Sequence, residues 1–94
     1  MPVDTTPVLS GTRPQPQVHL SAALDEVIID GAPNGATVTA FADACLAAAV
    51  DETGEATEDW TVMHEGATRA VGAQQRIKFM RASRDVSVLT LVWS

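Results

Sequence analysis

The sequence is poor in the residues that usually carry chemistry or cross-links. Its 94 residues include one cysteine, two histidines and no tyrosine, and aromatic residues make up only 4% of the chain. A single cysteine excludes an intramolecular disulfide, which favours a reducing compartment. Because apolar residues still make up 46% of the chain, we expect a folded protein whose core consists mainly of small aliphatic side chains.

Long apolar runs are also missing. No stretch reaches the ~18 apolar residues that a membrane-spanning helix needs. The first residues, MPVDTTPVLS, lack the basic flank and the apolar run of a secretory signal peptide. The sequence therefore predicts a cytoplasmic protein, with incorporation into a virion as the alternative.

Basic residues are scarce and unevenly placed. The chain has twelve acidic and six basic residues, a net charge of −6 and a pI near 4.5. Residues 1–66 hold eleven of the acids but only one base, Arg13, whereas residues 67–94 hold five bases and one acid. Nucleic acids and anionic membranes are bound through clustered Lys and Arg, so this balance argues against both. We expect a protein partner, or self-association, instead.

Four of the five prolines fall within residues 1–17. Pro14 and Pro16 alternate with glutamine, and proline lacks the backbone donor that the interior of a sheet requires. We predict that residues 1–17 form a flexible N-terminal arm, which is either a simple tail or a segment that orders on a partner. The length of the remaining sequence predicts one domain over residues 18–94.

Apolar periodicity predicts several strands within this domain. Val18 and Leu20 alternate with polar residues, and residues 27–29 are all β-branched, which together predict an antiparallel hairpin. A third strand is predicted over residues 60–64. The last segment, residues 86–93, is a nearly continuous apolar run, so we expect a central strand that a helix covers on one face.

The main helix is predicted over residues 38–50. Apolar side chains recur there at helical spacing, and Thr37 is a suitable N-cap. Ile77, Phe79 and Met80 are apolar among bases and fit a short strand or a single helical turn. The expected buried stripe of the main helix comprises Val38, Phe41, Cys45 and Ala49.

The order of these elements resembles the β-grasp fold of ubiquitin-like proteins. The resemblance extends over about residues 18–92 and implies an α+β fold, in which a mixed sheet of four to five strands packs on one main helix. Three segments carry it. They are Thr37-Val38 before Phe41 and Cys45, which resembles the start of the ubiquitin helix, residues 62–66 (VMHEG), which resemble the third strand and its closing turn, and residues 88–92 (VLTLV), which resemble the final strand.

The resemblance implies a scaffold without conjugation chemistry. Conjugated ubiquitin-like proteins and sulfur carriers end in a Gly-Gly tail, whereas this sequence ends in Trp93-Ser94. Tail-less bacterial relatives include ubiquitin-like components of type VII secretion and tail-assembly proteins of some phages. The implied function is a non-catalytic protein-interaction module, or adaptor, in a bacterial multiprotein assembly. The alternative is a small structural or assembly protein of a phage capsid or tail.

No combination of residues predicts catalysis, a metal site or a cofactor site. Cys45 has only alanine and leucine nearby in sequence and lies on the predicted buried stripe, so we expect an inert core thiol. His19 and His64 lie far apart in the sequence and lack the short spacing of metal ligands. The acids of residues 51–59 match no calcium loop. We therefore expect a protein that is not an enzyme and binds no cofactor or metal.

Trp93 is the strongest candidate in the sequence for partner binding. It lies one residue from the last, where a core role is hard to arrange, and Trp and Arg are typical anchors of interfaces. We predict an interface that comprises Trp93 with Arg81 or Arg84. The alternative is that Trp93 packs at the edge of the core.

Overall fold

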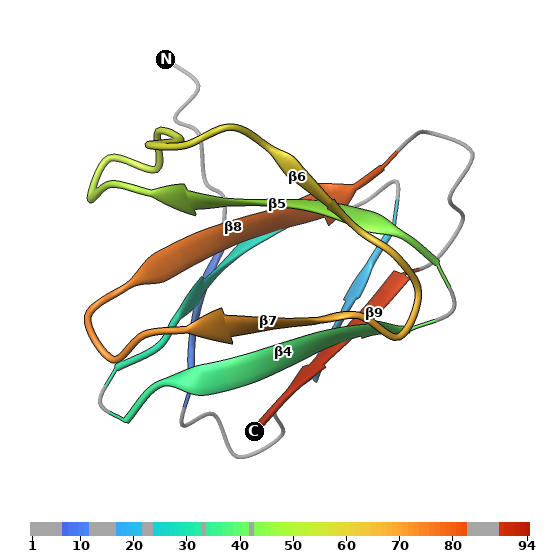
Figure 1. Cartoon of the computed structure of the whole chain (residues 1–94), viewed down its shortest axis with the longest axis horizontal. Helices are drawn as coiled ribbons and strands as arrows, with labels where there is room; N and C mark the ends of the chain where they lie inside the picture. The colour runs from blue at the N-terminus through green and yellow to red at the C-terminus, as the bar shows by residue number, and fades with distance from the viewer. Residues whose placement is uncertain (1–6, 12–16, 22–23, 33, 42, 83–88) are drawn as a thin grey trace.

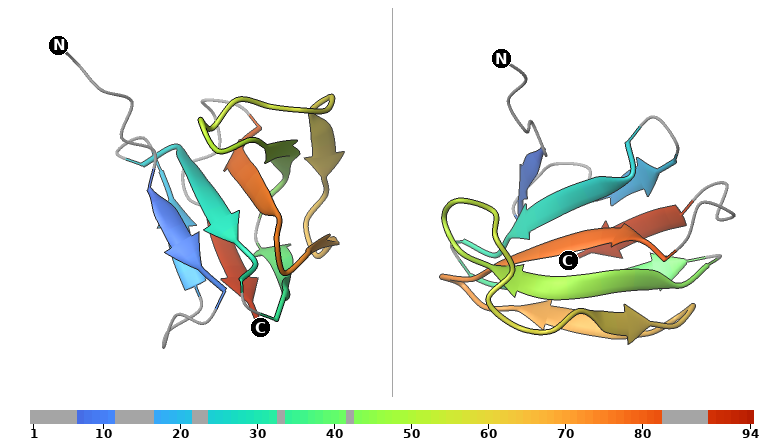
Figure 2. Two further views of the ribbon diagram at one scale, coloured as in Figure 1. Left: turned by 90° about the vertical axis from the view of Figure 1, so that its left-hand side faces the viewer. Right: turned by 90° about the horizontal axis from the view of Figure 1, so that it is seen from above.

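The described part of the chain is all-β, and its strands form two facing sheets (Figure 1, Figure 2). The computed structural model describes residues 7–11, 17–21, 24–32, 34–41, 43–82 and 89–94. Within these residues there is no helix, and so none that could span a membrane. The strands are β1 (Val8–Ser10), β2 (Gln17–Leu20), β3 (Glu26–Asp30), β4 (Ala36–Phe41), β5 (Cys45–Val50), β6 (Thr61–Met63), β7 (Thr68–Val71), β8 (Arg76–Arg81) and β9 (Leu89–Trp93).

The strand order defines a jelly roll. One sheet, called here the five-stranded sheet, has the order β1-β3-β8-β5-β6, and the four-stranded sheet has the order β2-β9-β4-β7. All neighbouring strands are antiparallel except β1 and β3. From β2 onward the chain passes from one sheet to the other at every step except between β5 and β6. Two antiparallel sheets of four strands connected in this way form the two Greek keys of a jelly roll, to which β1 adds an edge strand.

The predicted β-grasp fold with one main helix is wrong, because residues 38–50 form parts of both sheets. β4 has the period of two of a half-buried strand: Val38 and Ala40 are buried, whereas Phe41 is 47% exposed. A helix would bury Phe41 on the same stripe as Val38. After a short break, β5 returns Cys45 to the core in the other sheet. The ubiquitin-like scaffold therefore does not describe this protein.

The alanine-rich sequence of β5, CLAAAV, explains why a helix is the local expectation. Alanine has the highest helix propensity of all residues, and nothing within these six residues opposes a helix. In the fold, β5 is paired with β8 on one side and with β6 on the other, so both of its edges are hydrogen-bonded. Tertiary pairing and the burial of small side chains on both faces override the local preference.

The predicted hairpin is also wrong, although both of its strands exist. β2 pairs with β9 in the four-stranded sheet, and β3 pairs with β8 in the five-stranded sheet. The strand predicted over residues 60–64 is confirmed as β6, and the segment 77–80 belongs to β8. The final strand is confirmed as central, since β9 lies between β2 and β4. The layer that covers β9 is the other sheet and not a helix (Figure 2).

The core fills the space between the inner faces of the two sheets. Its largest side chains are Trp93 and Phe79, which are at most 1% exposed. The indole Nε1 of Trp93 donates a hydrogen bond to the carbonyl oxygen of Ser10 (3.3 Å), which satisfies the only donor of the ring. The other core residues are mainly aliphatic. They include Leu20, Val27, Ile29, Val38, Ala40, Cys45, Ala47, Val71, Ile77, Leu89 and Leu91.

Part of the proline-rich N-terminal segment belongs to the sheet. β1 pairs in parallel with β3, and the amide of Ile28 donates to the carbonyl of Pro7 (2.9 Å). An edge position suits a strand beside a proline, because one side of an edge strand needs no hydrogen-bonded neighbour. Residues 1–6 and 12–16, which are predicted to be flexible, lie outside the described part of the chain.

Candidate protein-interaction surface

The outer face of the five-stranded sheet is largely apolar. Side chains alternate along each strand. On β5, Cys45 and Ala47 point into the core, so Leu46 and Ala48 point outward. The strand register extends this face across the sheet. One row runs across β6, β5 and β8 through Val62, Leu46 and Met80, and the next row contains Ala48, Lys78, Ile28 and Val8.

The loop that follows β5 covers one half of this face. The amide of Gly54 donates to the carbonyl of Asp51 (3.0 Å), and the amide of Asp51 donates to the carbonyl of Glu55 (2.9 Å). This turn lies against the sheet, because a Cβ atom at Gly54 would lie 3.7 Å from Cδ1 of Ile28. A cavity of about 140 Å³ between the turn and the sheet is lined by Ile28 and Lys78, among others, and both are less than 10% exposed.

The other half of the face is open to solvent, and we call its apolar cluster the Trp60 patch. It comprises Leu46, Trp60, Val62 and Met80. Val62 is 50% exposed and Trp60 is 40% exposed, whereas Leu46 and Met80 are half-buried. Leu46 pairs directly with both Val62 and Met80, so three of the four side chains stand next to one another. Trp60 lies just outside β6, two residues before Val62, and from the alternation of side chains along an extended chain we infer that both point to the same face.

The basic residues of β8 on this face form ion pairs with acidic residues of β3. Nε of Arg76 lies 3.2 Å from Oδ2 of Asp30, and Nζ of Lys78 lies 3.9 Å from Oε2 of Glu26. Both pairs lie beside the covered half of the sheet, where Lys78 is 9% exposed. Their basic side chains are therefore engaged within the molecule.

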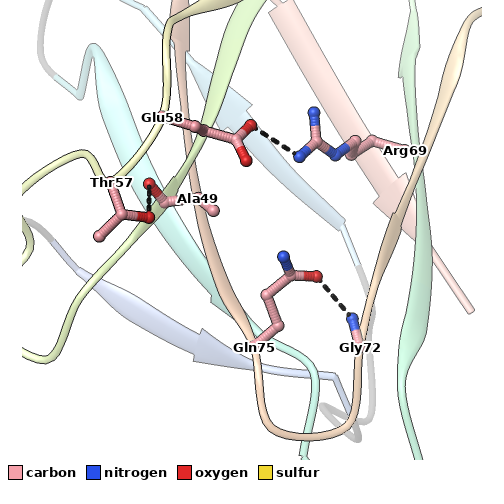
Figure 3. A network of polar contacts seen from close by, with 6 residues as sticks. All are labelled: Ala49, Thr57, Glu58, Arg69, Gly72 and Gln75. Carbon is pink, nitrogen blue, oxygen red and sulfur yellow. Dashed lines mark hydrogen bonds and ion pairs between the residues drawn. The ribbon is translucent and has the colours of Figure 1, made fainter.

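A second polar network links the two sheets (Figure 3). Nη2 of Arg69 on β7 donates to Oε2 of Glu58 in the loop before β6 (2.9 Å), and this bond holds the pKa of Glu58 below its usual range. The hydroxyl of Thr57 donates to the carbonyl of Ala49 (3.3 Å) and fixes the same loop to β5. The loop that leads into Trp60 is thus held at two consecutive residues, Thr57 by β5 and Glu58 by β7.

Exposed acidic side chains flank Trp60 and β6 in the sequence. Glu55 and Asp59 precede it and Glu65 follows β6; all three are exposed and form no ion pair with any described residue. Asp51 has its carboxylate engaged in the turn, where the hydroxyl of Thr53 is the main cause of its lowered pKa. The solvent side of this region is therefore negative as well as apolar.

The two strands at this side of the sandwich differ in how their free edges are protected. β6 ends the five-stranded sheet and β7 ends the four-stranded sheet. On β7, Arg69 pairs with the buried Val38 of β4 and so points inward, and an inward charge on an edge strand discourages further strand pairing. β6 carries neither a charge nor a proline, and Thr61 and Val62 are exposed. The edge of β6 is thus the less protected of the two.

The outer face of the four-stranded sheet has a different character. Its register places Gln17, Val92, Thr39 and Thr68 in one row across all four strands. In the adjacent row, Nδ1 of His19 lies 2.8 Å from the Thr90 hydroxyl. Phe41 is the large apolar residue that is exposed on this sheet. The face is therefore mostly polar.

A groove of about 590 Å³ lies where the loops after β3, β5 and β7 meet. Its lining includes the Asp30–Arg76 ion pair and the engaged carboxylate of Asp51. Gln75, which also lines it, accepts a hydrogen bond from the amide of Gly72 through Oε1 (3.0 Å; Figure 3). Each of these polar groups is thus engaged in an ion pair or a hydrogen bond within the chain.

Of the three residues of the predicted interface, the structure describes Trp93 and Arg81. Trp93 is 1% exposed and belongs to the core, which favours the packing alternative. Arg81 is half-buried at the end of β8, and Arg84 lies outside the described residues. A role in partner binding for Arg81 and Arg84 stays a prediction.

The other candidate residues are also separated. Cys45 is fully buried on β5, and burial raises the pKa of its thiol to about 11. His19 and His64 are exposed, on β2 and after β6 respectively. No group of three potential metal ligands occurs among the residues that the structure describes.

Sequence reasoning gave Trp93 more weight than Trp60 as a candidate for an exposed aromatic residue, whereas the structure buries Trp93 and exposes Trp60. Trp60 precedes a strand with alternating apolar residues, and this pattern predicts the strand but not its position at an edge. A signal was nevertheless present, because Trp60 follows a run of acids in residues 51–59, and a solvated loop is a poor neighbour for a core residue. The last strand, by contrast, is central, and its Trp93 is covered by the opposite sheet.

The strand order defines this chain as a jelly-roll protein, and comparison with known proteins adds one similar fold. No protein-family model and no curated protein match the sequence. A chain in the crystal structure of Drosophila melanogaster CENP-C bound to CAL1 is similar to it, with a TM-score of 0.61 and 15% sequence identity over 83% of this chain. The match spans 63% of that other chain. At this level of identity, the likeness concerns the fold alone.

Proposed function

We propose that this protein is a small non-catalytic jelly-roll module that binds a partner protein through the Trp60 patch. The observation that carries the proposal is the exposure of Trp60 and Val62 beside Leu46 and Met80 on a sheet face whose other half is covered. A cluster of neighbouring apolar side chains that includes an aromatic residue is typical of the centre of a protein interface. The firmly held loop before Trp60 lowers the entropic cost of binding there.

The likeness to the CENP-C–CAL1 structure supports a role in protein association. That structure is of one protein bound to another, and the similar chain shares its fold with this one. Fold alone does not determine function, so the support is general and does not extend to the identity of the partner. We place the protein in the cytoplasm, where a free thiol such as Cys45 stays reduced, with a virion as the alternative.

A structural or assembly role in a phage particle is the second candidate. The jelly roll is a common architecture of viral capsid domains, which the predicted β-grasp fold is not. The two roles differ in solution behaviour. Light scattering after size-exclusion chromatography gives a stable monomer for an adaptor, and it gives concentration-dependent oligomers for a self-assembling subunit.

The binding proposal is tested by comparing two exposed aromatic residues. The wild-type chain, Trp60→Ser and Phe41→Ser are each immobilised and exposed to an extract of the native host. Phe41 is 47% exposed on the opposite sheet, so Phe41→Ser is a matched control for the loss of an exposed aromatic ring. We expect one protein to be retained by the wild type and by Phe41→Ser but lost with Trp60→Ser. Equal retention by all three chains would remove the Trp60 patch as the binding site.

A further inference from the structure

We propose, building on the proposed function, that the partner contributes an extended basic segment that adds to the five-stranded sheet as a new strand beside β6. The proposal rests on three features of the region: the edge of β6, which carries no charge and no proline, the apolar side chains that stand beside it and the sign of the surrounding charge. Strand addition to an exposed sheet edge is a common mode of peptide recognition.

The edge of β6 provides the backbone groups for this pairing. β6 has one neighbour, β5, and ends the sheet, so every second residue of Thr61–Met63 directs its amide and carbonyl away from the sheet. The comparable edge of β7 carries the inward Arg69 and its ion pair with Glu58. Of these two adjacent edges, only that of β6 lacks a charge that discourages pairing.

The Trp60 patch provides the side-chain contacts. A strand paired with β6 would place alternate side chains on the outer face, next to Val62, at the roughly 5 Å separation of directly opposed residues. Val62 is 50% exposed and Trp60 is 40% exposed, so an incoming apolar side chain would bury surface that is now open to water. Apolar residues at every second position of the segment match this requirement.

The charge around the edge selects a basic segment. Asp59 lies just before Trp60 and Glu65 lies two residues after β6, and both are exposed and outside any ion pair of the described chain. Lys or Arg at the two ends of a short segment would therefore meet an acid at each end of β6. Such pairs add specificity and association rate more than affinity.

The same charges disfavour a second copy of this chain as the occupant. Antiparallel pairing of two β6 strands about a two-fold axis at Val62 would bring Asp59 of one copy towards Glu65 of the other, and would do so twice. Like charges opposite one another destabilise strand pairs. The net charge of −6 adds to this repulsion.

The proposal is tested with synthetic peptides of about nine residues, a length suited to one strand. A basic library has Lys or Arg at both ends and Val, Ile, Thr or Phe at alternate internal positions, and an acidic library has Glu in place of each base. Binding to the full chain is measured by fluorescence anisotropy. We expect members of the basic library to bind at least about tenfold more tightly than their acidic counterparts, and to weaken as salt screens the charges.

Two controls test the strand pairing itself. Methylation of alternate backbone nitrogens in a binding peptide removes the donors and should weaken binding by at least about tenfold. Trp60→Ser should weaken binding by a similar factor of about ten, while Phe41→Ser leaves it within about twofold. Absence of binding by the whole basic library, equal binding of the acidic library, or indifference to N-methylation would each overturn strand addition. A chain that dimerises in light scattering would point to a second copy instead.

The outcome for strand addition can be separated from that for the proposed function. If a host protein is retained in a Trp60-dependent manner but no basic peptide binds, the patch remains the interface and strand addition is wrong. If peptides bind without dependence on Trp60, both proposals are wrong, because the apolar patch then contributes nothing.

Discussion

The outer faces of the two sheets differ in composition although both enclose the same core. On the four-stranded sheet the outward positions are mainly threonine, glutamine and histidine, so this face is well hydrated. On the five-stranded sheet, apolar side chains occupy most outward positions, and a turn after β5 covers half of them. A sheet that is apolar on both faces needs a cover on each of them. Here the opposite sheet covers the inner face, and the turn after β5 covers only half of the outer face. The difference identifies the uncovered half as the surface where a partner is expected.

The two tryptophans offer the strongest test of this comparison. Trp93→Ala removes a ring that is 1% exposed and should lower the free energy of unfolding by about 4 kcal/mol, through lost burial and a residual cavity. Trp60→Ala removes a ring that is 40% exposed and should lower it by less than about 1 kcal/mol. Urea denaturation monitored by circular dichroism measures both. Equal losses for the two variants would mean that Trp60 is a structural residue.

Charge placed at a buried outward position of β5 tests the other half of the outer face. Ala48 is fully buried at an outward position of β5, so Ala48→Asp would bury a carboxylate and should destabilise the fold by about 3 kcal/mol. Thr37→Asp puts the same group on the exposed outer face of β4 and should change stability by no more than about 0.5 kcal/mol. Thermal unfolding of the two variants is the measurement. A mild effect of Ala48→Asp would show that this position is not shielded from water.

The labelling rate of a cysteine thiol distinguishes a position in the core, such as Cys45, from a position on the edge strand β6. Burial raises its pKa to about 11, so little thiolate is present at neutral pH, and the side chain is inaccessible. Labelling with a thiol reagent at pH 7 should be at least about a hundredfold slower in the folded protein than in urea, because it requires opening of the sheet. A Cys45→Ala, Thr61→Cys double variant carries its thiol on the exposed β6 and should react without this delay. Rapid labelling of native Cys45 would contradict its position on β5.

Sequence patterns predicted the strands of this protein better than their partners. Val18 and Leu20, residues 27–29 and the last strand all have alternating or continuous apolar sequences, and all are strands. Which strands pair depends on contacts between residues far apart in the chain, and the short link between β2 and β3 favoured a hairpin that does not form. Local patterns do not distinguish a hairpin from a crossing between two sheets.

The false helix shows a second limit of sequence reasoning. In residues 38–50, Val38, Cys45 and Ala49 fit a helical stripe and also fit two strands separated by a break. The expected buried thiol at Cys45 is confirmed in the structure, because both interpretations put it in the core. The exposure of Phe41 distinguishes the two interpretations. A helix would bury this side chain, whereas at the end of β4 it is exposed. The Trp60 patch depends on strand pairing across the sheet and was therefore missed.

Amide hydrogen exchange of the complex tests most directly whether the open half of the five-stranded sheet is the interface. NMR spectra of the full chain would be compared with and without the protein that the wild type retains. Our account predicts slower exchange at the amides of β6 and unchanged exchange in β4 and β7 of the four-stranded sheet. Protection confined to β4 and β7, with no change in β6, would contradict it.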